Sequence, residues 1–427
     1  EDLASLDGGH VLSHKERRQK RSQTGGSGFG GSESILVALG SKLGDYRRDM
    51  LLAAIYIMRS DTRGEVRQAS LNIWKQVVTN TPRVMRAILP CLLETAMNSL
   101  AATSVERQTI AGRALGDLIR KMGDKVTPSL LPALQHSIRP TEPLSSRVGA
   151  CLAITEVAKA LGRNGCLPHM DALIAILSMA VLDGEYSVHL AAAEAVEALR
   201  VAGGSPVLEE LLPSLIAAAG SQEEEAAQLA RHSLRAIIAL NGSAALVVLP
   251  TLLAPPLEES QVVSLHVLSE AAGNALSSQT ERILGVLAAG LGDNADNEVM
   301  ISSLQKCIAS VARSAAPHVA VQAVLEMSKD QTPLRRRSGA SVVSVLAETK
   351  RISTESEEEG VVEAAVDMFG LLLPLLKDLD VDTRIAGLAG VESIVKSGTK
   401  TAAVVLLPSL KQWLLSSDIA FADHIPA

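Results

Sequence analysis

Residues 66–75, Val-Arg-Gln-Ala-Ser-Leu-Asn-Ile-Trp-Lys, decide how this chain folds. Apolar side chains recur here at three- and four-residue spacing, which is the period of an α-helix with one buried face. Similar helix openings follow forty residues later at Arg107 and forty later again at Arg147. This period predicts stacked pairs of antiparallel helices, because a single pair cannot cover its own apolar face and its neighbours must do so.

A second recurring phrase, an apolar run closed by Leu-Pro, marks the first helix of each pair. We expect each proline to bend this helix, because proline lacks an amide hydrogen and clashes with the preceding turn. The two phrases predict about nine pairs between residues 46 and 400, and a tenth pair that begins near Thr401. The expected fold is all-α, a HEAT/ARM-type α-solenoid whose antiparallel helix pairs form a right-handed superhelix of roughly nine to ten repeats. The prolines are Pro90, Pro132, Pro213, Pro250, Pro374 and Pro408.

The composition of the chain agrees with a helical array. Hydrophobic residues make up 47% of it and aromatic residues only 2%, so its apolar contacts depend on Leu, Ala, Val and Ile. The net charge of −7 differs from the strongly basic balance of a dedicated nucleic-acid-binding domain. No apolar run reaches the roughly 18 residues of a transmembrane helix. We therefore expect a cytoplasmic protein with no membrane contact.

Residues 1–34 differ in composition from the rest of the chain. A basic run precedes a glycine-rich stretch at residues 25–32, and neither can bury a core. We expect a flexible linker here, followed by one HEAT-repeat array over residues 35–427 that continues beyond both ends in a longer protein. An exposed acidic loop is predicted near residues 350–360, where a run of glutamates interrupts the repeat.

No pattern in the sequence is typical of a catalytic, cofactor or metal site. Phosphate-binding loops, Gly-x-Ser-x-Gly and His-Glu-x-x-His are all absent. The cysteines form no Cys-x-x-Cys pair, so we expect them to be reduced core residues. The chain is predicted to be no enzyme and to take no cofactor or small-molecule substrate; an enzyme with a helical fold would need buried carboxylates or histidines facing a cleft. The cysteines are Cys91, Cys151, Cys166 and Cys307.

Arginines near the start of the second helix are the candidate structural residues. In HEAT arrays such arginines commonly pair with an acidic residue of an adjacent repeat, which predicts a ladder of ion pairs along the stack. The alternative is direct contact with an acidic partner. The predicted ladder residues are Arg67, Arg107, Arg147 and Arg384.

Two basic clusters are candidates for contact with anions or partners. The first is Arg335, Arg336 and Arg337, which follow Thr332-Pro333 at a helix start, where the helix dipole favours anions. Its alternative is a solvated helix face with one arginine in the ladder. The second is the basic run near the N-terminus, a candidate for ribosomal RNA phosphates or a nuclear localisation signal, with a solvated linker as the alternative. Its cations are Lys15, Arg17, Arg18, Lys20 and Arg21.

Two stretches of the chain resemble one family in sequence detail. They are residues 55–83, which contain Ile-Tyr-Ile-Met-Arg-Ser-Asp-Thr, and residues 107–123, Arg-Gln-Thr-Ile-Ala-Gly-Arg-Ala-Leu-Gly-Asp-Leu-Ile-Arg-Lys-Met-Gly. Both are similar to the general-control-nonderepressible (Gcn-one) translational activators. From Gly149 onward the resemblance is one of HEAT periodicity.

The resemblance implies a fragment from the C-terminal half of a very large cytosolic scaffold. Such proteins bind ribosomes and recruit, through its RWD domain, the starvation-sensing kinase that phosphorylates translation initiation factor two alpha. No individual site residue can be transferred from the family to this sequence.

Other HEAT-repeat adaptors share the same periodicity. Transport receptors and phosphatase scaffolds are alternatives, but they lack the phrase at residues 55–82. Tubulin-binding HEAT domains often carry a tryptophan in the first turn, whereas Trp74 lies in the middle of its predicted helix. We therefore expect Trp74 to be a core residue.

Overall fold

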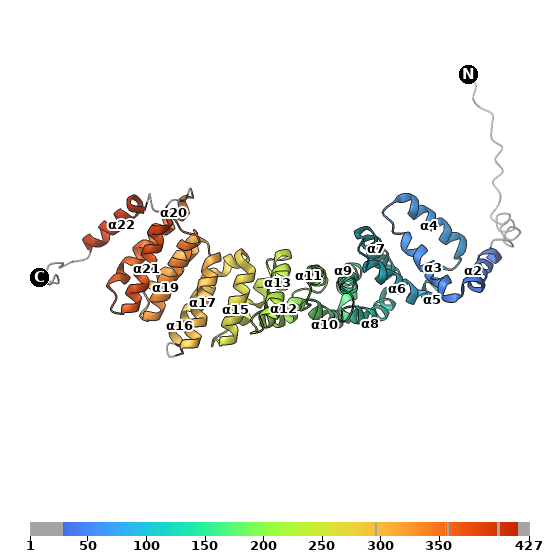
Figure 1. Ribbon diagram of the computed structural model, residues 1–427, viewed down its shortest axis with the longest axis horizontal. Coiled ribbons are helices and arrows are strands. Elements are labelled where there is room, and N and C mark those ends of the chain that lie inside the picture. Colours follow the sequence, from blue (N-terminus) through green and yellow to red (C-terminus); the bar gives the residue numbers. More distant parts are fainter. Residues whose placement is uncertain (1–28, 295–296, 355, 357, 399–401, 417–427) are drawn as a thin grey trace, which may run out of the picture. The chain divides into compact units, whose positions relative to one another are not determined.

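The computed structural model describes residues 29–294, 297–354, 356, 358–398 and 402–416. Helices dominate these ranges, and no strand occurs within them. The chain forms two compact units, one of residues 1–180 with 201–203 and the other of residues 181–200 with 204–427. Each unit is a series of packed helix pairs, which confirms the predicted all-α solenoid class (Figure 1).

The first unit begins with α2 (Phe29–Leu43), which starts inside the segment expected to be a linker. Three helix pairs follow it, and the second helices of the last two pairs also pack against each other. The unit ends with α10 (Met170–Ala180). The pairs are α3 (Asp45–Met58) with α4 (Gly64–Val77), α6 (Leu89–Leu100) with α7 (Val105–Met122), and α8 (Thr127–Ser137) with α9 (Leu144–Cys166); the short α5 (Thr81–Ala87) precedes α6.

The second unit holds most of α11 (Tyr186–Gly203) and five helix pairs. Its second helices pack side by side in chain order, as Figure 1 shows for α15, α17, α19 and α21. The helices α10 and α11 follow each other in the chain at the boundary between the units. If they are counted with the eight pairs inside the units, a first helix is followed by a second helix nine times in the described residues, which is the expected number. The pairs are α12 (Pro206–Ala219) with α13 (Glu224–Leu240), α14 (Ala244–Leu252) with α15 (Glu259–Ala272), α16 (Thr280–Asp293) with α17 (Glu298–Ser314), α18 (Pro317–Ser328) with α19 (Pro333–Glu348), and α20 (Glu359–Leu372) with α21 (Val381–Ser397); α22 (Ala402–Ser416) opens a tenth.

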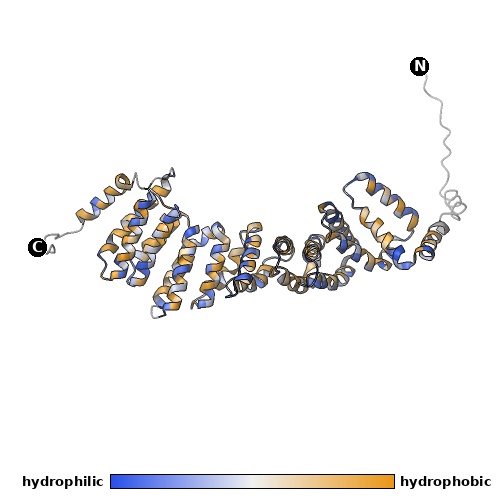
Figure 2. Cartoon of the chain, viewed as in Figure 1, coloured by the Kyte–Doolittle hydropathy of each residue, from blue (hydrophilic) through white to orange (hydrophobic). Residues whose placement is uncertain are grey.

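The core of each unit lies between its stacked helices. Hydrophobic and hydrophilic residues alternate around most helices, so that one face of each is apolar (Figure 2). Trp74 is 3% exposed, which confirms its predicted place in the core. Cys151, Cys166 and Cys307 are buried as expected, whereas Cys91 is only half-buried.

The recurring prolines act in two ways. At Pro90 the helix is interrupted, since α5 ends at Ala87 and α6 begins at Leu89. At Pro374 the α-helix gives way to the 3-10 turn η4 (Leu373–Lys377). The expected bend of the first helix stays a prediction at the other four prolines, which lie inside a continuous helix. They are Pro132, Pro213, Pro250 and Pro408.

The segment predicted to be an exposed acidic loop joins α19 to α20 and is partly buried. Ile352 is inaccessible to solvent. Ser353 Oγ donates to Ser397 O at 2.9 Å, and Thr354 Oγ1 donates to Gly398 O at 3.1 Å. These hydroxyls satisfy carbonyl oxygens at the end of α21, which explains why this part of the loop packs inward. Glu358, by contrast, is exposed as expected.

Candidate functional site

The turns between the helices of a pair share one arrangement in four places. An aspartate opens the turn, and its carboxylate accepts a hydrogen bond from the amide two residues further on. Asp61 Oδ1, for example, accepts from Arg63 N at 2.8 Å. Aspartate favours such turns because its short side chain reaches nearby amides. The bond fixes the point at which the second helix begins. The four aspartates are Asp61, Asp183, Asp330 and Asp378.

The fourth residue of the second helix holds the same turn from the other side. Its side chain bonds to the carbonyl oxygen six residues earlier, an interaction that we call the six-residue contact. Arg67 Nη1 donates to Asp61 O and to Thr62 O, each at 2.8 Å. Main-chain carbonyls in a packed turn need such donors, so the contact is structural. It is made by Arg67, Gln108, His189, Arg336 and Arg384, at 2.8, 2.9, 2.6, 2.8 and 2.7 Å.

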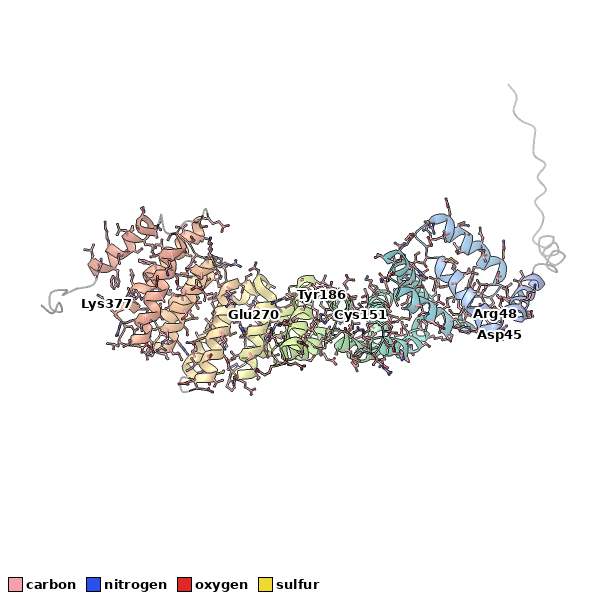
Figure 3. All side chains as sticks on the ribbon, viewed as in Figure 1. Asp45, Arg48, Cys151, Tyr186, Glu270 and Lys377 are labelled. Carbon is pink, nitrogen blue, oxygen red and sulfur yellow. The ribbon has the colours of Figure 1, made fainter. Side chains whose placement is uncertain are left out.

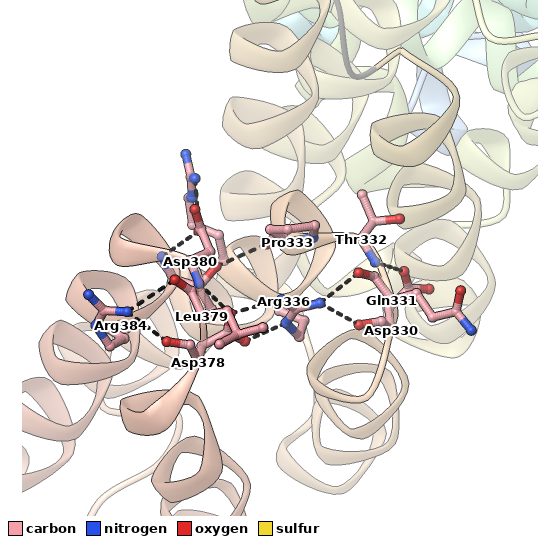
Figure 4. A network of polar contacts seen from close by, with 11 residues as sticks. Asp330, Gln331, Thr332, Pro333, Arg336, Asp378, Leu379, Asp380 and Arg384 are labelled. Carbon is pink, nitrogen blue, oxygen red and sulfur yellow. Dashed lines mark hydrogen bonds and ion pairs between the residues drawn. The ribbon is translucent and has the colours of Figure 1, made fainter.

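One arginine also joins two neighbouring repeats (Figure 4). Arg336 Nε and Nη2 donate to Asp378 Oδ2 and Oδ1, at 2.6 and 2.9 Å. The two side chains are 16% and 9% exposed, so this two-bond pair is shielded from solvent. The hydrogen bonds lower the pKa of the Asp378 carboxyl and raise the pKa of the Arg336 guanidinium. Arg336 therefore links the second helix of one repeat to the turn of the next.

The other two arginines of this cluster are also paired. Arg335 Nη1 lies 2.7 Å from Asp330 Oδ2, and Arg337 Nη2 lies 3.1 Å from Asp380 Oδ2. Thr383 and then Arg337 donate hydrogen bonds that lower the pKa of Asp380 to about 2. All three guanidinium groups therefore face carboxylates. The geometry favours the structural interpretation of this cluster over the predicted contact with an external anion.

The predicted ladder differs in detail from the observed contacts. Arg67 and Arg384 bond to main-chain oxygens of their own turn, not to an acidic residue of the adjacent repeat. In α7 the six-residue contact comes from Gln108, because this helix begins at Val105 and Arg107 is only its third residue. Arg107 is exposed. Arg147 is the fourth residue of α9 and is 8% exposed, as a structural residue would be.

The second predicted basic cluster lies outside the described residues. Its members are Lys15, Arg17, Arg18, Lys20 and Arg21.

Several members of the site were not anticipated, among them Gln108 and the aspartates of the turns. His189 takes the place of an arginine, and its Nε2 carries the proton because it lies 2.6 Å from Asp183 O. Asp378 was not considered as the partner of Arg336. For the six-residue contact a usable signal was present, since an aspartate stands six residues before each of His189, Arg336 and Arg384.

An aromatic cluster lies in the part of the chain that carries the family resemblance. The rings of Tyr56 and Trp74 meet edge to face at 5.5 Å, and the Arg59 guanidinium lies 4.8 Å from the centre of the Tyr56 ring. Burial raises the pKa of Tyr56 to about 12. Trp74 Nε1 donates to Thr81 Oγ1 at 3.1 Å. These side chains therefore pack α3 against α4.

The described ranges show no sign of metal chemistry. They contain no group of three or more His, Cys, Asp or Glu side chains placed to hold a metal ion. No single helix among them has the length and apolar character to cross a membrane, although α13 and α14, with a bend of 119° between them, meet that test together.

Comparison with known proteins shows similarity to one set of sequences. A family described as "Stalled ribosome sensor GCN1-like, HEAT repeats" matches residues 245–422. The human protein "Stalled ribosome sensor GCN1" is 31% identical over 349 residues, which are 81% of this chain and 13% of the human protein. The Saccharomyces cerevisiae "eIF-2-alpha kinase activator GCN1" is 30% identical over 299 residues, or 69% of this chain and 11% of the yeast protein.

Among solved structures, the match to importin beta covers 96% of this chain and 53% of the importin chain, at 14% sequence identity. Its TM-score of 0.31 is too low to support a conclusion.

The stacked helix pairs and the match to a HEAT-repeat family together identify a HEAT-repeat protein. The family match falls on residues 245–422, where the sequence alone showed only periodicity. The chain belongs to the GCN1 family. It spans about an eighth of the length of the human relative, of which it covers 13%.

Proposed function

We propose that this chain is part of a non-catalytic cytoplasmic scaffold that associates with ribosomes and promotes phosphorylation of translation initiation factor two alpha. Membership of the GCN1 family carries the proposal, because the relatives are named as a stalled ribosome sensor and an eIF-2-alpha kinase activator. The fold supports it, since stacked repeats offer long surfaces for macromolecules.

The proposed mechanism is one of effective concentration. A scaffold that holds a ribosome on one stretch and the kinase's RWD domain on another raises the local concentration of the kinase near its activating ligand. The scaffold makes and breaks no covalent bond. The proposal includes contact with ribosomal RNA phosphates, which would make ribosome association depend on salt.

Two binding assays on the whole chain test this function. The chain is sedimented with polysomes that carry collided ribosomes, and in parallel it is used to capture the kinase's RWD domain, each at low and at high salt. Ribosome association that weakens with salt, or RWD capture that survives it, supports the scaffold role. If the folded chain bound neither, the proposal would be wrong for this part of the protein.

The variant Arg336→Ala with Asp378→Ala serves as a control for these assays. The two side chains form an ion pair with each other, so the proposal gives neither of them a contact with the ribosome or the kinase. Binding should therefore be unchanged wherever circular dichroism shows that the double variant is folded.

A further inference from the structure

The second unit is acidic as a whole but basic in one place. Residues 181–427 contain 17 Lys and Arg against 31 Asp and Glu, a net charge of −14. The acidic residues of α13, α15 and α17 lie mainly in the first turns, where the helix dipole favours them. The remainder of these three helices carries several cations and only one acidic residue, Glu270.

Two short distances and the electrostatic environment of His266 place these cations around it. His266 Nε2 and Arg313 Nη1 lie 3.8 and 3.9 Å from the same oxygen, Glu270 Oε1. Burial lowers the pKa of His266; the charges of Arg313, Lys306 and Arg231 act in the same direction, and Glu270 opposes them. Glu270, which is labelled in Figure 3, lies on α15, between α13 and α17 in chain order. Three adjacent second helices thus contribute to one surface.

The loop after α19 extends this surface by one more repeat. Arg351 Nε donates to Arg313 O at 3.1 Å, and Arg351 Nη2 donates to Asn274 Oδ1 at 3.0 Å. Neither Arg351 nor Lys306 forms an ion pair within the described ranges. We call the surface formed by Arg231, His266, Lys306, Arg313 and Arg351 the basic patch.

Helix stability alone does not explain the basic patch. Cations in the last turn of a helix complement its dipole, and Arg313 has that position. Lys306 lies in the middle of α17, where the dipole gives no benefit. Arg231 lies in the middle of α13 and also pairs with Glu224 of its own helix at 3.2 Å. Lys306 is exposed, and the Arg313 side chain is 54% exposed, so both are accessible to a partner.

We propose that the basic patch binds an acidic segment of a partner protein. Neighbouring helices pack about 10 Å apart, so the patch is about 30 Å long and matches a short extended peptide. A long polyanion such as RNA would extend past the patch over the acidic surface around it. Salt screens these charges within about 8 Å, so only a short acidic segment gains from the patch without this repulsion. The proposal goes beyond the scaffold role and holds whether or not the chain binds ribosomes.

Fluorescence anisotropy with a labelled octaglutamate peptide tests the proposal on the whole chain, at about 50 and about 200 mM NaCl. We expect Lys306→Gln with Arg313→Gln to weaken binding about threefold to tenfold, the sum of two exposed ion pairs. The matched control, Arg282→Gln with Lys329→Gln, removes two exposed cations from α16 and from the end of α18. It should change the affinity less than about twofold.

Glu270→Gln provides a second test in the opposite direction. Removing the carboxylate that lies beside His266 and Arg313 should strengthen octaglutamate binding by about twofold to fivefold, an effect that loss of folding cannot imitate. Equal losses in both double variants, or no gain from Glu270→Gln, would overturn the proposal. Tighter binding of a labelled oligouridine of similar length would also overturn it and identify the patch as a site for RNA.

Discussion

At the scale of single residues, Arg336 combines two roles. It makes the six-residue contact with Asp330 O at 2.8 Å, and it also forms two bonds with Asp378 in the next repeat. Arg67 and Arg384 make only the first of these interactions among the described residues. A shielded carboxylate that loses its partner is costly, so Arg336 and Asp378 should depend on each other energetically.

A double-mutant cycle measures this dependence. We expect Arg336→Ala and Asp378→Ala to show a coupling free energy of about 1–3 kcal/mol in urea unfolding, because the pair is shielded and has two bonds. The control pair is Arg120 with Asp117, whose side chains are 57% and 44% exposed. Its coupling should stay below about 0.5 kcal/mol. Equal coupling in the two pairs would contradict our interpretation of Arg336.

Acid should loosen the same region. The carboxyls of Asp378 and Asp380 have lowered pKa values, that of Asp380 about 2 against an ordinary 3.8. Groups with depressed pKa values stabilise the fold fully above the ordinary value and lose this effect as the pH falls toward the folded value. We therefore expect a loss of stability between pH 4 and pH 2.

The fluorescence of Trp413 reports this change, because Lys377 beside Asp378 lies 4.8 Å from its ring. A Trp74→Phe background leaves Trp413 as the single tryptophan. Adding Asp380→Asn should reduce the pH dependence. An unchanged pH profile would show that Asp380 does not contribute.

At the scale of helices, small residues control how closely the repeats approach. A Cβ atom added to Gly149 in α9 would lie 2.9 Å from Ala101 N and 3.1 Å from Leu100 C, which are main-chain atoms. One added to Gly285 in α16 would meet nothing within 4 Å. Both glycines lie inside helices, but only Gly149 lacks room for a side chain.

Alanine substitutions separate these two cases. Gly149→Ala should lower the free energy of unfolding by about 2 kcal/mol, because the main chain of the neighbouring repeat must move. Gly285→Ala should raise it by about 0.5–1 kcal/mol, the ordinary gain of alanine over glycine in a helix. Thermal unfolding of the two variants measures both changes in stability. A stabilised Gly149→Ala variant would contradict the close contact described for Gly149.

The helices were easier to predict from the sequence than the contacts between them. Repetition of apolar residues gave the pairs, because burial of one face requires that period. The prediction from the forty-residue spacing of arginines was wrong for one ladder residue. The distance between helix starts is not constant, since α4, α7 and α9 begin at Gly64, Val105 and Leu144. A shift of one residue turns a side chain by 100° around a helix and so replaced Arg107 by Gln108. The Arg336–Asp378 bond joins residues 42 positions apart, which no local pattern reveals.

At the scale of the whole molecule, each repeat contacts mainly its neighbours. Stability in such arrays is a sum of local terms, and damage to one repeat spreads only to those beside it. Leu115 in α7 and Leu304 in α17 are both fully buried, at 1% and 0% exposure, and they belong to different units. They form a matched pair for testing how far a local defect spreads.

Hydrogen exchange followed by mass spectrometry can locate the effect of each substitution. Leu115→Ala and Leu304→Ala should each cost about 2–5 kcal/mol locally. We expect the first to raise exchange in α6–α9 and to leave α17–α21 unchanged, and the second to do the reverse. Exchange that rises throughout the chain in either variant would mean that the described residues unfold as one cooperative body.

The six-residue contact also has a consequence for how such an array can change over evolutionary time. Arg67 and Arg384 donate to main-chain oxygens, which every residue type carries. Their contacts should therefore persist when the side chains of these turn residues are replaced. A repeat of this kind can be duplicated or exchanged as a module. Arg336 and Asp378 are different, because recombination between their repeats would leave an unpaired charge on each side. The two repeats that end in α19 and α21 should therefore be inherited together.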